Sequence, residues 1–404
     1  MSTVMRSRTS NPFVLALYWL GIQSVWGAIL GISLQSRSIE LSGADALIAY
    51  SRLATIGALV AAVVQIGVGF WSDARRRKGS RRIEFYVAGA LGGSAALLFF
   101  YLAPSMASLT LGYIGLQLAL NLAIGPYQAI IPDFVGRARY GVASSWMAAL
   151  QSVGNAVGAL AASFIGGARL LAGFLSALLV ATCAATSIHV RGLSLQDAVA
   201  EEAPAPLRVT RPFVDLFVSR ALVYAGFYTL LGYLLFYVRG VLGIAALADA
   251  KRHTGILIIS FTVVGALGAA LAARPSDRLD KRLVATVGGG AFIAALGIFI
   301  ATSGFSGAVA ATIVAGLGWG VFLVADWAIA CRVLPPAAMG TAMGIWNIAI
   351  LLPQIAAPAV TLAVLQRLAL TGGPLAPRVA FGLALGETVA GIAWLWRLSR
   401  QVVG

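Results

Sequence analysis

Two carboxylic acids lie inside long apolar segments, where a charged side chain is costly and is usually retained for function. Asp326 follows the apolar run "GLGWGVFLVA" and stands six residues before Arg332. Glu387 lies within the apolar segment 378–396. A carboxyl group that is protonated in one conformation and ionised in another is what a proton carrier requires. We therefore predict that Asp326, and after it Glu387, couples proton movement, with a hydrogen bond between helices as the structural alternative for each.

Aromatic and amide side chains recur on single faces of four apolar segments, at spacings that place them on one side of a helix. Rings stack on the C–H faces of a polyhydroxylated ligand, and amides exchange hydrogen bonds with its hydroxyl groups. The same set suits an amphipathic drug, and for any single residue helix packing is the alternative. Arg220 and Arg52 are candidate counter-ions for the buried acids. The predicted substrate-binding residues are Trp19, Gln23, Trp26, Gln117, Asn121, Tyr224, Tyr228, Trp319 and Phe322.

Two charged clusters that begin with Ser-Asp each follow an apolar segment: "SDARRRKGSRR" and, far along the chain, "SDRLDKR". A carboxylate at a helix end beside arginines holds two helices together only while they are close, which is how a gate is latched. Basic residues in a short cytoplasmic loop are the simpler explanation. We expect Asp73 to pair with Arg139 in one state, and we predict gating roles for Asp73, Arg139, Asp133, Asp277 and Arg332.

Membrane helices must position these residues, because the composition excludes an ordinary soluble domain. Hydrophobic residues make up 60% of the chain and charged residues 11%, against about a quarter charged in soluble domains. A bilayer span needs about 20 mostly apolar residues. We predict twelve spans with short connections: residues 12–34, 46–71, 83–102, 109–131, 142–165, 170–188, 213–238, 254–273, 283–302, 307–331, 341–365 and 378–396.

The order of the motifs divides the chain into six-helix halves, residues 1–188 and 212–404, joined by a cytoplasmic linker at 189–211. The Ser-Asp clusters follow the second and eighth spans. A second pair of segments supports the same division: "YQAIIPDFVGRARYG" at 127–141 in the first half matches "DWAIACRVLPPAAMG" at 326–340 in the second. Two parallel six-helix halves with the substrate between them resemble the arrangement of major facilitator transporters.

The net charge of +15 is distributed to one side of the predicted topology. With a cytoplasmic N-terminus, 20 of the 29 Lys and Arg residues fall in the two tails and in loops on the same side, which is the positive-inside pattern. A nucleic-acid-binding protein would carry a basic stripe on a folded polar surface instead. We predict a multi-pass protein of the bacterial inner membrane, the plasma membrane, with both termini cytoplasmic and no nucleic-acid partner.

The sequence predicts no metal site, no cofactor and no enzymatic centre. Its cysteines, Cys183 and Cys331, and its histidines, His189 and His253, lack the spacing of zinc or redox sites. No nucleophile, base and orienting group share a motif. The first apolar segment is longer than the core of a signal peptide, so we expect it to be the first span.

The loop with Gly69 and Asp73 resembles the signature between the second and third spans of the major facilitator superfamily. Other stretches are similar to the sucrose/proton symporter-like group of bacterial transporters, relatives of the glycoside-pentoside-hexuronide cation symporters. The resemblance implies an all-α, twelve-helix major facilitator fold, alternating access and proton-coupled sugar or glycoside movement, with the first helix of each triplet lining the cavity. The stretches are "WGAILGISLQSRSIEL", "YQAIIPDFVGRARYG", "GFYTLLGYLLFYVRGVLG", "GLGWGVFLVADWAIACRVLP" and "GIWNIAILLPQIAAP".

The chain departs from that group at Arg332, where the group has an acid before Val-Leu-Pro, whereas the first half keeps its acid, Asp133. A latch built from both halves would then be asymmetric, with Arg332 paired to an acid such as Asp277 or Asp280. Glu84, at the start of the third span, is also unusual for the group.

Our hypothesis is a monomeric secondary active transporter whose partners are a small-molecule substrate, protons and the lipid bilayer. Proton-coupled symport of a sugar or glycoside is the first interpretation. A proton-driven exporter or antiporter of an amphipathic small molecule is the alternative, and a non-transporting receptor or assembly protein on the same fold is a second alternative.

Overall fold

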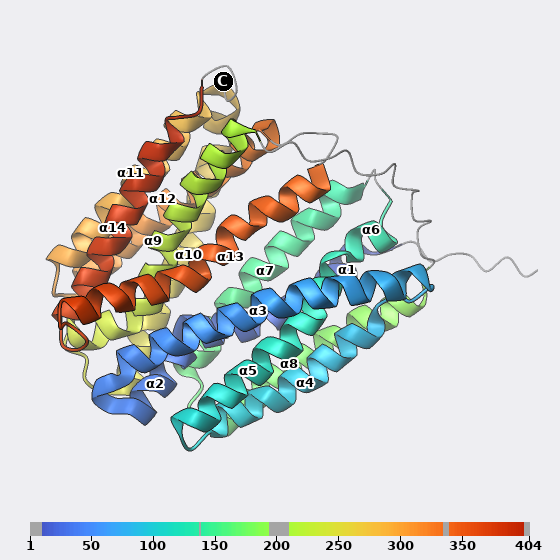
Figure 1. The fold of residues 1–404 in the computed structure, drawn as a ribbon, viewed down its shortest axis with the longest axis horizontal. Coiled ribbons are helices and arrows are strands. Elements are labelled where there is room, and N and C mark those ends of the chain that lie inside the picture. Colours follow the sequence, from blue (N-terminus) through green and yellow to red (C-terminus); the bar gives the residue numbers. More distant parts are fainter. Residues whose placement is uncertain (1–9, 137–138, 194–209, 334–338, 400–404) are drawn as a thin grey trace, which may run out of the picture. The chain divides into compact units, whose positions relative to one another are not determined.

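The computed structural model describes residues 10–136, 139–193, 210–333 and 339–399, and its regular elements within these ranges are all helices. Figure 1 labels the α-helices. The elements up to α8 are α1 (Pro12–Ala28), the π-helical turn η1 (Ile29–Ser33), α2 (Leu34–Ser42), the 3-10 turn η2 (Gly43–Asp45), α3 (Ala46–Arg77), α4 (Ile83–Leu102), α5 (Met106–Gln128), α6 (Ile130–Phe134), α7 (Tyr140–Phe164) and α8 (Ala168–Arg191). They are followed by α9 (Arg211–Gly240), α10 (Leu247–Arg278), α11 (Lys281–Ala301), α12 (Phe305–Val333), α13 (Met339–Arg367) and α14 (Leu375–Leu395).

Each predicted span is a helix in the structure. In the described residues, 11 helical stretches are long and apolar enough to cross a membrane, and the first of them, Pro12–Arg77, includes both α1 and α3. The twelve-helix prediction is therefore confirmed. The sequence missed α2, which continues the first span through a polar segment that we expected to be a loop. Of the predicted linker 189–211, residues 194–209 lie outside the described part of the chain.

The described residues form two compact units, and the division differs in one segment from the predicted halves. Residues 38–55 belong to the second unit, where Ser51 Oγ lies 2.9 Å from the Tyr233 hydroxyl and the Tyr50 ring contacts the Tyr233 ring. The division into residues 1–188 and 212–404 stays a prediction about the repeat. The first unit comprises Met1–Arg37 and Ile56–Glu201, and the second Ser38–Thr55 and Glu202–Gly404.

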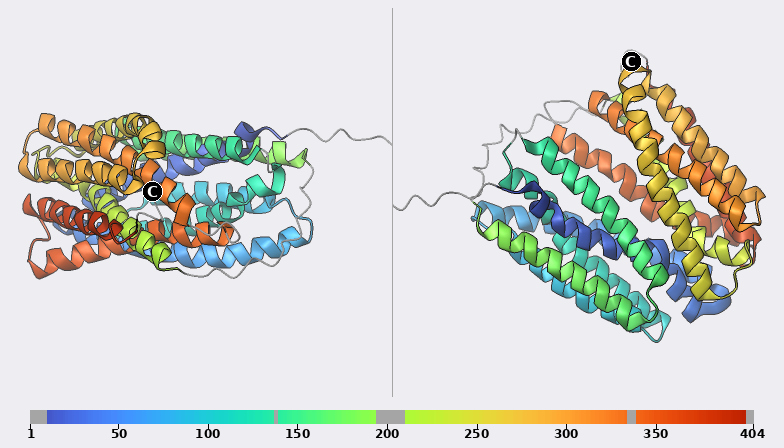
Figure 2. Two further views of the ribbon diagram at one scale, coloured as in Figure 1. Left: turned by 90° about the horizontal axis from the view of Figure 1, so that it is seen from above. Right: turned by 180° about the vertical axis from the view of Figure 1, so that it is seen from behind.

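The helices pack in the same order inside each unit. In the first unit, α1 packs against α7 and α8, and α4 packs against α5 and α8. In the second unit, α9 packs against α13 and α14, and α11 packs against α12 and α14; α10 also packs against α12, as the view from behind in Figure 2 shows. This recurrence supports an internal repeat.

The helices α1 and α9 carry the same tripeptide, Pro-Phe-Val, at or next to their first residue. Proline is tolerated in the first turn because its missing N–H would have no helical partner there. Asn11 Oδ1 accepts a hydrogen bond from the backbone N of Phe13 at 3.0 Å in α1, and Thr210 Oγ1 accepts one from Phe213 N at 3.4 Å in α9. These caps fix equivalent starting points for two helices that carry different side chains further along.

Glycines let pairs of helices approach closely in both units. A Cβ at Gly158 of α7 would collide with the carbonyl oxygen of Ser24 in α1, and a Cβ at Gly320 of α12 would collide with that of Gly265 in α10. Small residues at helix crossings allow this kind of packing in membranes. The polar side chains of the neighbouring turns are therefore held at short range.

Candidate substrate and proton sites

A chain of hydrogen-bonded amides joins α3 and α5 inside the first unit. Gln65 Nε2 donates to Asn121 Oδ1 at 2.7 Å, and Asn121 Nδ2 donates to Gln117 Oε1 at 3.0 Å. Gln117 Nε2 donates to the Tyr113 hydroxyl at 3.0 Å. The structure thus brings together the predicted Gln117 and Asn121, which are buried, and adds Gln65 and Tyr113. The sequence held a signal for both, since Gln65 is polar within an apolar span and Tyr113 precedes Gln117 by four residues.

The predicted residues of α1 have separate surroundings in the same unit. Trp19 is buried with its ring centroid 5.4 Å from that of Tyr127, and among the described residues its Nε1 has no hydrogen-bond partner. Gln23 Nε2 donates to Gln151 Oε1 of α7 at 3.4 Å, and Trp26 is half-buried. Of these three residues, Gln23 is therefore the one with a hydrogen bond to a polar side chain of a neighbouring helix in the described part of the chain.

Arg220 of α9 and Asp326 of α12 form a buried ion pair in the second unit, in which Nη1 donates to Oδ2. Both side chains are 3% exposed. Arg220 Nη2 donates weakly to the Tyr224 hydroxyl at 3.4 Å, and the guanidinium carbon lies 3.5 Å from the ring centroid of Trp346. The candidate proton carrier and its candidate counter-ion are thus in contact. Sequence reasoning missed Trp346 of α13, and nothing in its neighbourhood marked it.

Aromatic rings gather around Trp319 in the second unit. Phe227 stacks on it with centroids 4.4 Å apart and 14° between the planes, and Tyr224 approaches it at 5.1 Å. Phe322 lies 5.9 Å from Trp319, and Tyr228 lies 5.3 Å from Phe227. The four residues predicted for this part of the chain therefore belong to one cluster, next to the ion pair through Tyr224.

Glu387 of α14 is half-buried and lies apart from that ion pair along α9. Its Oε2 accepts a hydrogen bond from Thr229 Oγ1 at 3.4 Å. Thr229 is nine residues beyond Arg220, which is about 13 Å of helix rise. The two predicted proton carriers therefore contact α9 at different levels.

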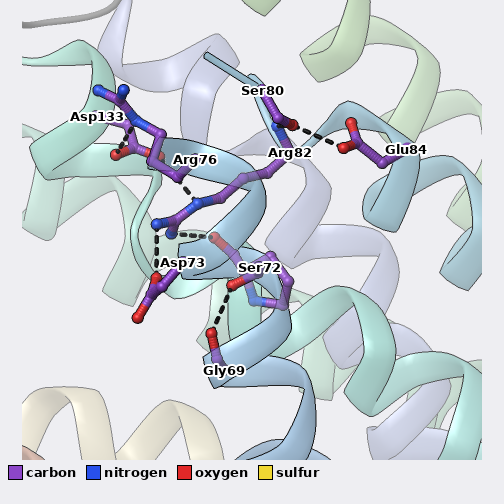
Figure 3. Close-up of polar contacts among 9 residues, drawn as sticks. Gly69, Ser72, Asp73, Arg76, Ser80, Arg82, Glu84 and Asp133 are labelled. Carbon is purple, nitrogen blue, oxygen red and sulfur yellow. Dashed lines mark hydrogen bonds and ion pairs between the residues drawn. The ribbon is translucent and has the colours of Figure 1, made fainter. Parts of the chain in front are cut away.

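Arg82, at the start of α4, contacts two of the predicted gating acids in the first unit (Figure 3). Its Nη2 donates to Asp73 Oδ1 at 2.8 Å, and its Nε lies 3.5 Å from Asp133 Oδ2. Arg76 Nε donates to Asp133 Oδ1 at 3.1 Å. Burial raises the pKa of the Asp133 carboxyl above its ordinary value, while the guanidinium groups of Arg82 and Arg76 act in the opposite direction. Sequence reasoning treated Arg82 as one member of a basic loop and missed this role.

The other predicted gating residues have varied positions. Arg139 is exposed, and its Nη1 donates to the carbonyl oxygen of Ser10 at 3.2 Å. Arg332 is exposed in the last turn of α12, and the side chain of Asp277 lies outside the described part of the structure. In this structure Asp73 is bound by Arg82, so its pairing with Arg139 stays a prediction about another state.

Within the described residues, no group of three or more His, Cys, Asp or Glu side chains is arranged to hold a metal ion. The polar centres of both units are built from amides, aromatic rings and ion pairs instead.

Residues 11–358 match the family model of the Major Facilitator Superfamily. The chain belongs to this superfamily. Together with its apolar helices, the match makes it a multi-pass membrane protein of a transporter family. The narrower similarity to sucrose/proton symporters stays a prediction, and no curated protein matches the sequence.

Solved structures of other superfamily transporters share the fold. A bacterial homologue of the human lysosomal transporter Spinster, in an inward-facing and unoccupied conformation, is 15% identical with a TM-score of 0.67, over 96% of each chain. The nucleoside transporter NupG is 15% identical with a TM-score of 0.68, over 96% of this chain and all of the other, 100%. A bacterial homologue of the iron transporter ferroportin is 14% identical with a TM-score of 0.64, over 96% and 98%. One of them is named as a nucleoside transporter and another as a homologue of an iron transporter, so the shared fold leaves the substrate open.

Proposed function

We propose that this protein is a secondary active transporter that works by alternating access and couples proton movement to that of a sugar or glycoside. The buried Arg220–Asp326 pair is the observation that carries the proposal. Removing two charges from water is expensive, and a buried ion pair is often no more stable than apolar residues in its place. A role in the transport cycle explains why the pair is present.

In this mechanism Asp326 takes up and releases the coupling proton, and Arg220 is its counter-ion. When the ion pair is closed, the carboxylate is ionised and the proton has left. When the helices move and the pair separates, the carboxyl group takes up a proton from water. Glu387, with its single hydrogen bond to Thr229, is the second candidate for this role.

Each unit, taken by itself, has side chains whose chemistry suits a polyhydroxylated substrate. The rings of Trp319, Phe227 and Tyr224 offer faces for C–H groups. The amides of Gln117 and Asn121 offer donors and acceptors for hydroxyl groups. The full proposed substrate-binding set is Trp19, Gln23, Trp26, Gln117, Asn121, Tyr224, Tyr228, Trp319 and Phe322.

An exporter or antiporter of an amphipathic molecule is a second candidate, because the rings around Trp319 also include Phe261, at 6.5 Å, and Phe292, at 5.6 Å. Such an apolar wall accepts a planar hydrophobic group as readily as a sugar. The two candidates differ in the direction in which a proton accompanies the substrate.

We also propose that the protein lies in the bacterial inner membrane as a monomer with both termini cytoplasmic, and that Asp73, Arg139, Asp133, Asp277 and Arg332 gate the cytoplasmic side. The basic last turn of α3, with Arg75, Arg76 and Arg77, supports this orientation. A reporter fused after Gly404 should be active in the cytoplasm. Activity only in the periplasm would exclude the orientation.

Transport by purified protein in proteoliposomes tests the proposed function. Adding the transported sugar outside should alkalinise the external medium, because protons enter with it. Acidification would instead identify an antiporter, and the absence of flux for any sugar would leave the receptor interpretation.

Asp326→Asn tests the residue assignment in the same vesicles. The amide keeps the shape of the side chain but cannot ionise, so pH-driven accumulation should be lost while counterflow of the same substrate survives. If the variant still concentrates substrate along a pH gradient, the assignment is wrong and Glu387 becomes the residue to test.

A further inference from the structure

Among the described residues, one of the contacts that hold the guanidinium group of Arg220 is with a negative charge. Nη1 binds Asp326, Nη2 reaches the neutral hydroxyl of Tyr224, and one face lies on the Trp346 ring. Within the described residues, the buried Nε has no hydrogen-bond partner. A planar cation stacked in this way presents its N–H groups at its edge, in the fork geometry that matches a carboxylate.

Asp215, a buried acid five residues before Arg220 on α9, is engaged by Arg211 at 3.9 Å and by Arg397 at 3.7 Å. Within the described residues, the other titratable groups of the helices that pack against α9 have contacts of their own. Tyr224 and Tyr228 of α9 face Arg220 with neutral hydroxyls. In the described parts of α10 and α11, the ion pairs Arg252–Asp249 and Arg282–Asp280 lie near the N-terminal ends of those helices. Arg367 stands in the last turn of α13, and Glu387 of α14 contacts α9 at Thr229, nine residues beyond Arg220.

The proposed function, on which this inference rests, therefore creates an electrostatic problem. When Asp326 takes up the coupling proton, Arg220 keeps its charge and loses its counter-ion. An unpaired charge inside a protein costs several kcal/mol, and the hydroxyl groups of a neutral sugar cannot remove that charge. A ligand that brings its own carboxylate can.

We propose that the transported molecule is a sugar acid, whose carboxylate takes the place of Asp326 on Arg220. A proton from water binds the Asp326 carboxylate, the Arg220–Asp326 ion pair opens, and an ion pair between Arg220 and the ligand carboxylate forms. On the other side of the membrane the carboxylate leaves, Asp326 releases its proton to water and the internal pair closes again. One positive and one negative charge move together, so the cycle transfers no net charge.

Matched ligands that differ only in one carboxylate test this proposal on the purified full chain. The pairs are D-gluconate with D-glucitol and D-glucuronate with D-glucose, together with the corresponding galacto pairs. We expect at least one acid to be taken up along a pH gradient, without a current on a solid-supported membrane, and to bind at least tenfold more tightly than its neutral partner. Binding of the acid should strengthen as the pH falls.

Variants separate the roles of the two residues. In Asp326→Asn, Arg220 has no internal competitor, so the acid should bind at least as tightly as to the wild type and independently of pH. In Arg220→Gln, the preference for the acid should fall at least tenfold. The double variant Arg220→Gln with Asp326→Asn leaves no unpaired charge and covers the case that a single variant does not fold. Arg252→Gln, in an exposed pair of the same unit at 3.7 Å, is the control and should bind like the wild type.

The outcomes distinguish this inference from the proposed function. Proton-driven uptake of a neutral sugar with an inward positive current would overturn the sugar-acid proposal and leave sugar symport intact. Retained pH dependence of acid binding in Asp326→Asn would also overturn it. If neither member of any pair is transported along a pH gradient, both proposals fail.

Discussion

The two units place different chemistry at equivalent positions of equivalent helices. Leu20 and Arg220 each lie eight residues after the proline in the first turn of α1 or α9. Tyr127 and Asp326 each precede an Ala-Ile pair by two residues. In the first unit the Tyr127 hydroxyl donates to the carbonyl oxygen of Leu15 at 2.6 Å. In the second unit the same two positions hold a buried ion pair.

This difference teaches that the fold does not require the ion pair. The first unit packs its helices in the same order with an apolar side chain and a phenol at those positions. Charges are therefore an addition to one copy of a repeated scaffold, at a desolvation cost that the other copy avoids. The proton chemistry that we propose is therefore confined to the second unit.

Giving the second unit the apolar character of the first should have the largest effect on activity. We predict that the double variant Arg220→Met with Asp326→Leu loses pH-driven accumulation by at least a hundredfold, because no ionisable group remains at the pair. Its folding should be preserved, since replacing a buried ion pair by apolar residues is neutral or stabilising by about 1–4 kcal/mol. Uptake in proteoliposomes and thermal denaturation in detergent measure the two effects.

The single variants are the controls for that experiment. Arg220→Met alone or Asp326→Leu alone leaves one buried charge unpaired, so each should destabilise the protein by about 3–5 kcal/mol. Unfolding temperatures of the single variants equal to that of the double variant would show that the two charges do not depend on each other. The comparison between the units would then lose its physical basis.

The two units also carry opposite charges where α5 and α12 end. Asp133 follows α5 in the first unit, and Arg332 stands at the corresponding place in the last turn of α12 in the second. Burial raises the pKa of Asp133 in the folded state, so the folded protein binds this proton more tightly than the unfolded chain does. Its contribution to the free energy of unfolding is therefore present at low pH and declines as the pH rises above about 3.9, the unfolded value, through the raised folded value.

We predict that Asp133→Asn flattens this decline. Thermal denaturation of the wild type and the variant across mildly acidic to neutral pH measures the difference. Asp249→Asn is the control, because Asp249 is an exposed acid that pairs with Arg252 at 3.7 Å. A variant whose stability declines with pH as steeply as that of the wild type would assign the effect to another group.

The sequence predicted the spans and the charged residues inside them, because both are visible in the local amino-acid composition. Asp326 and Arg220 were recognised as charges within apolar runs. Trp346 and Gln65 were not linked to their sites, because contact between distant helices depends on how each helix is rotated. Arg82 is one of several arginines in its loop, and it is buried with a left-handed backbone conformation, φ 62°, at the start of α4, which basic composition does not specify.

Breaking the amide chain of the first unit should have the smallest effect of these variants. It tests whether proton chemistry is confined to the second unit. Asn121→Leu leaves Gln65 Nε2 and Gln117 Oε1 without their partner, and hydrogen bonds between membrane helices contribute about 0.6 kcal/mol on average and up to about 1.7. We predict a loss of stability in that range and a severalfold higher KM, with the number of protons moved per substrate unchanged. Ser94→Ala, which removes a hydroxyl bonded only to its own helix at Ala90 O, is the control. If Asn121→Leu uncouples proton from substrate movement, proton chemistry is shared between the units and the mechanism confined to the second unit is wrong.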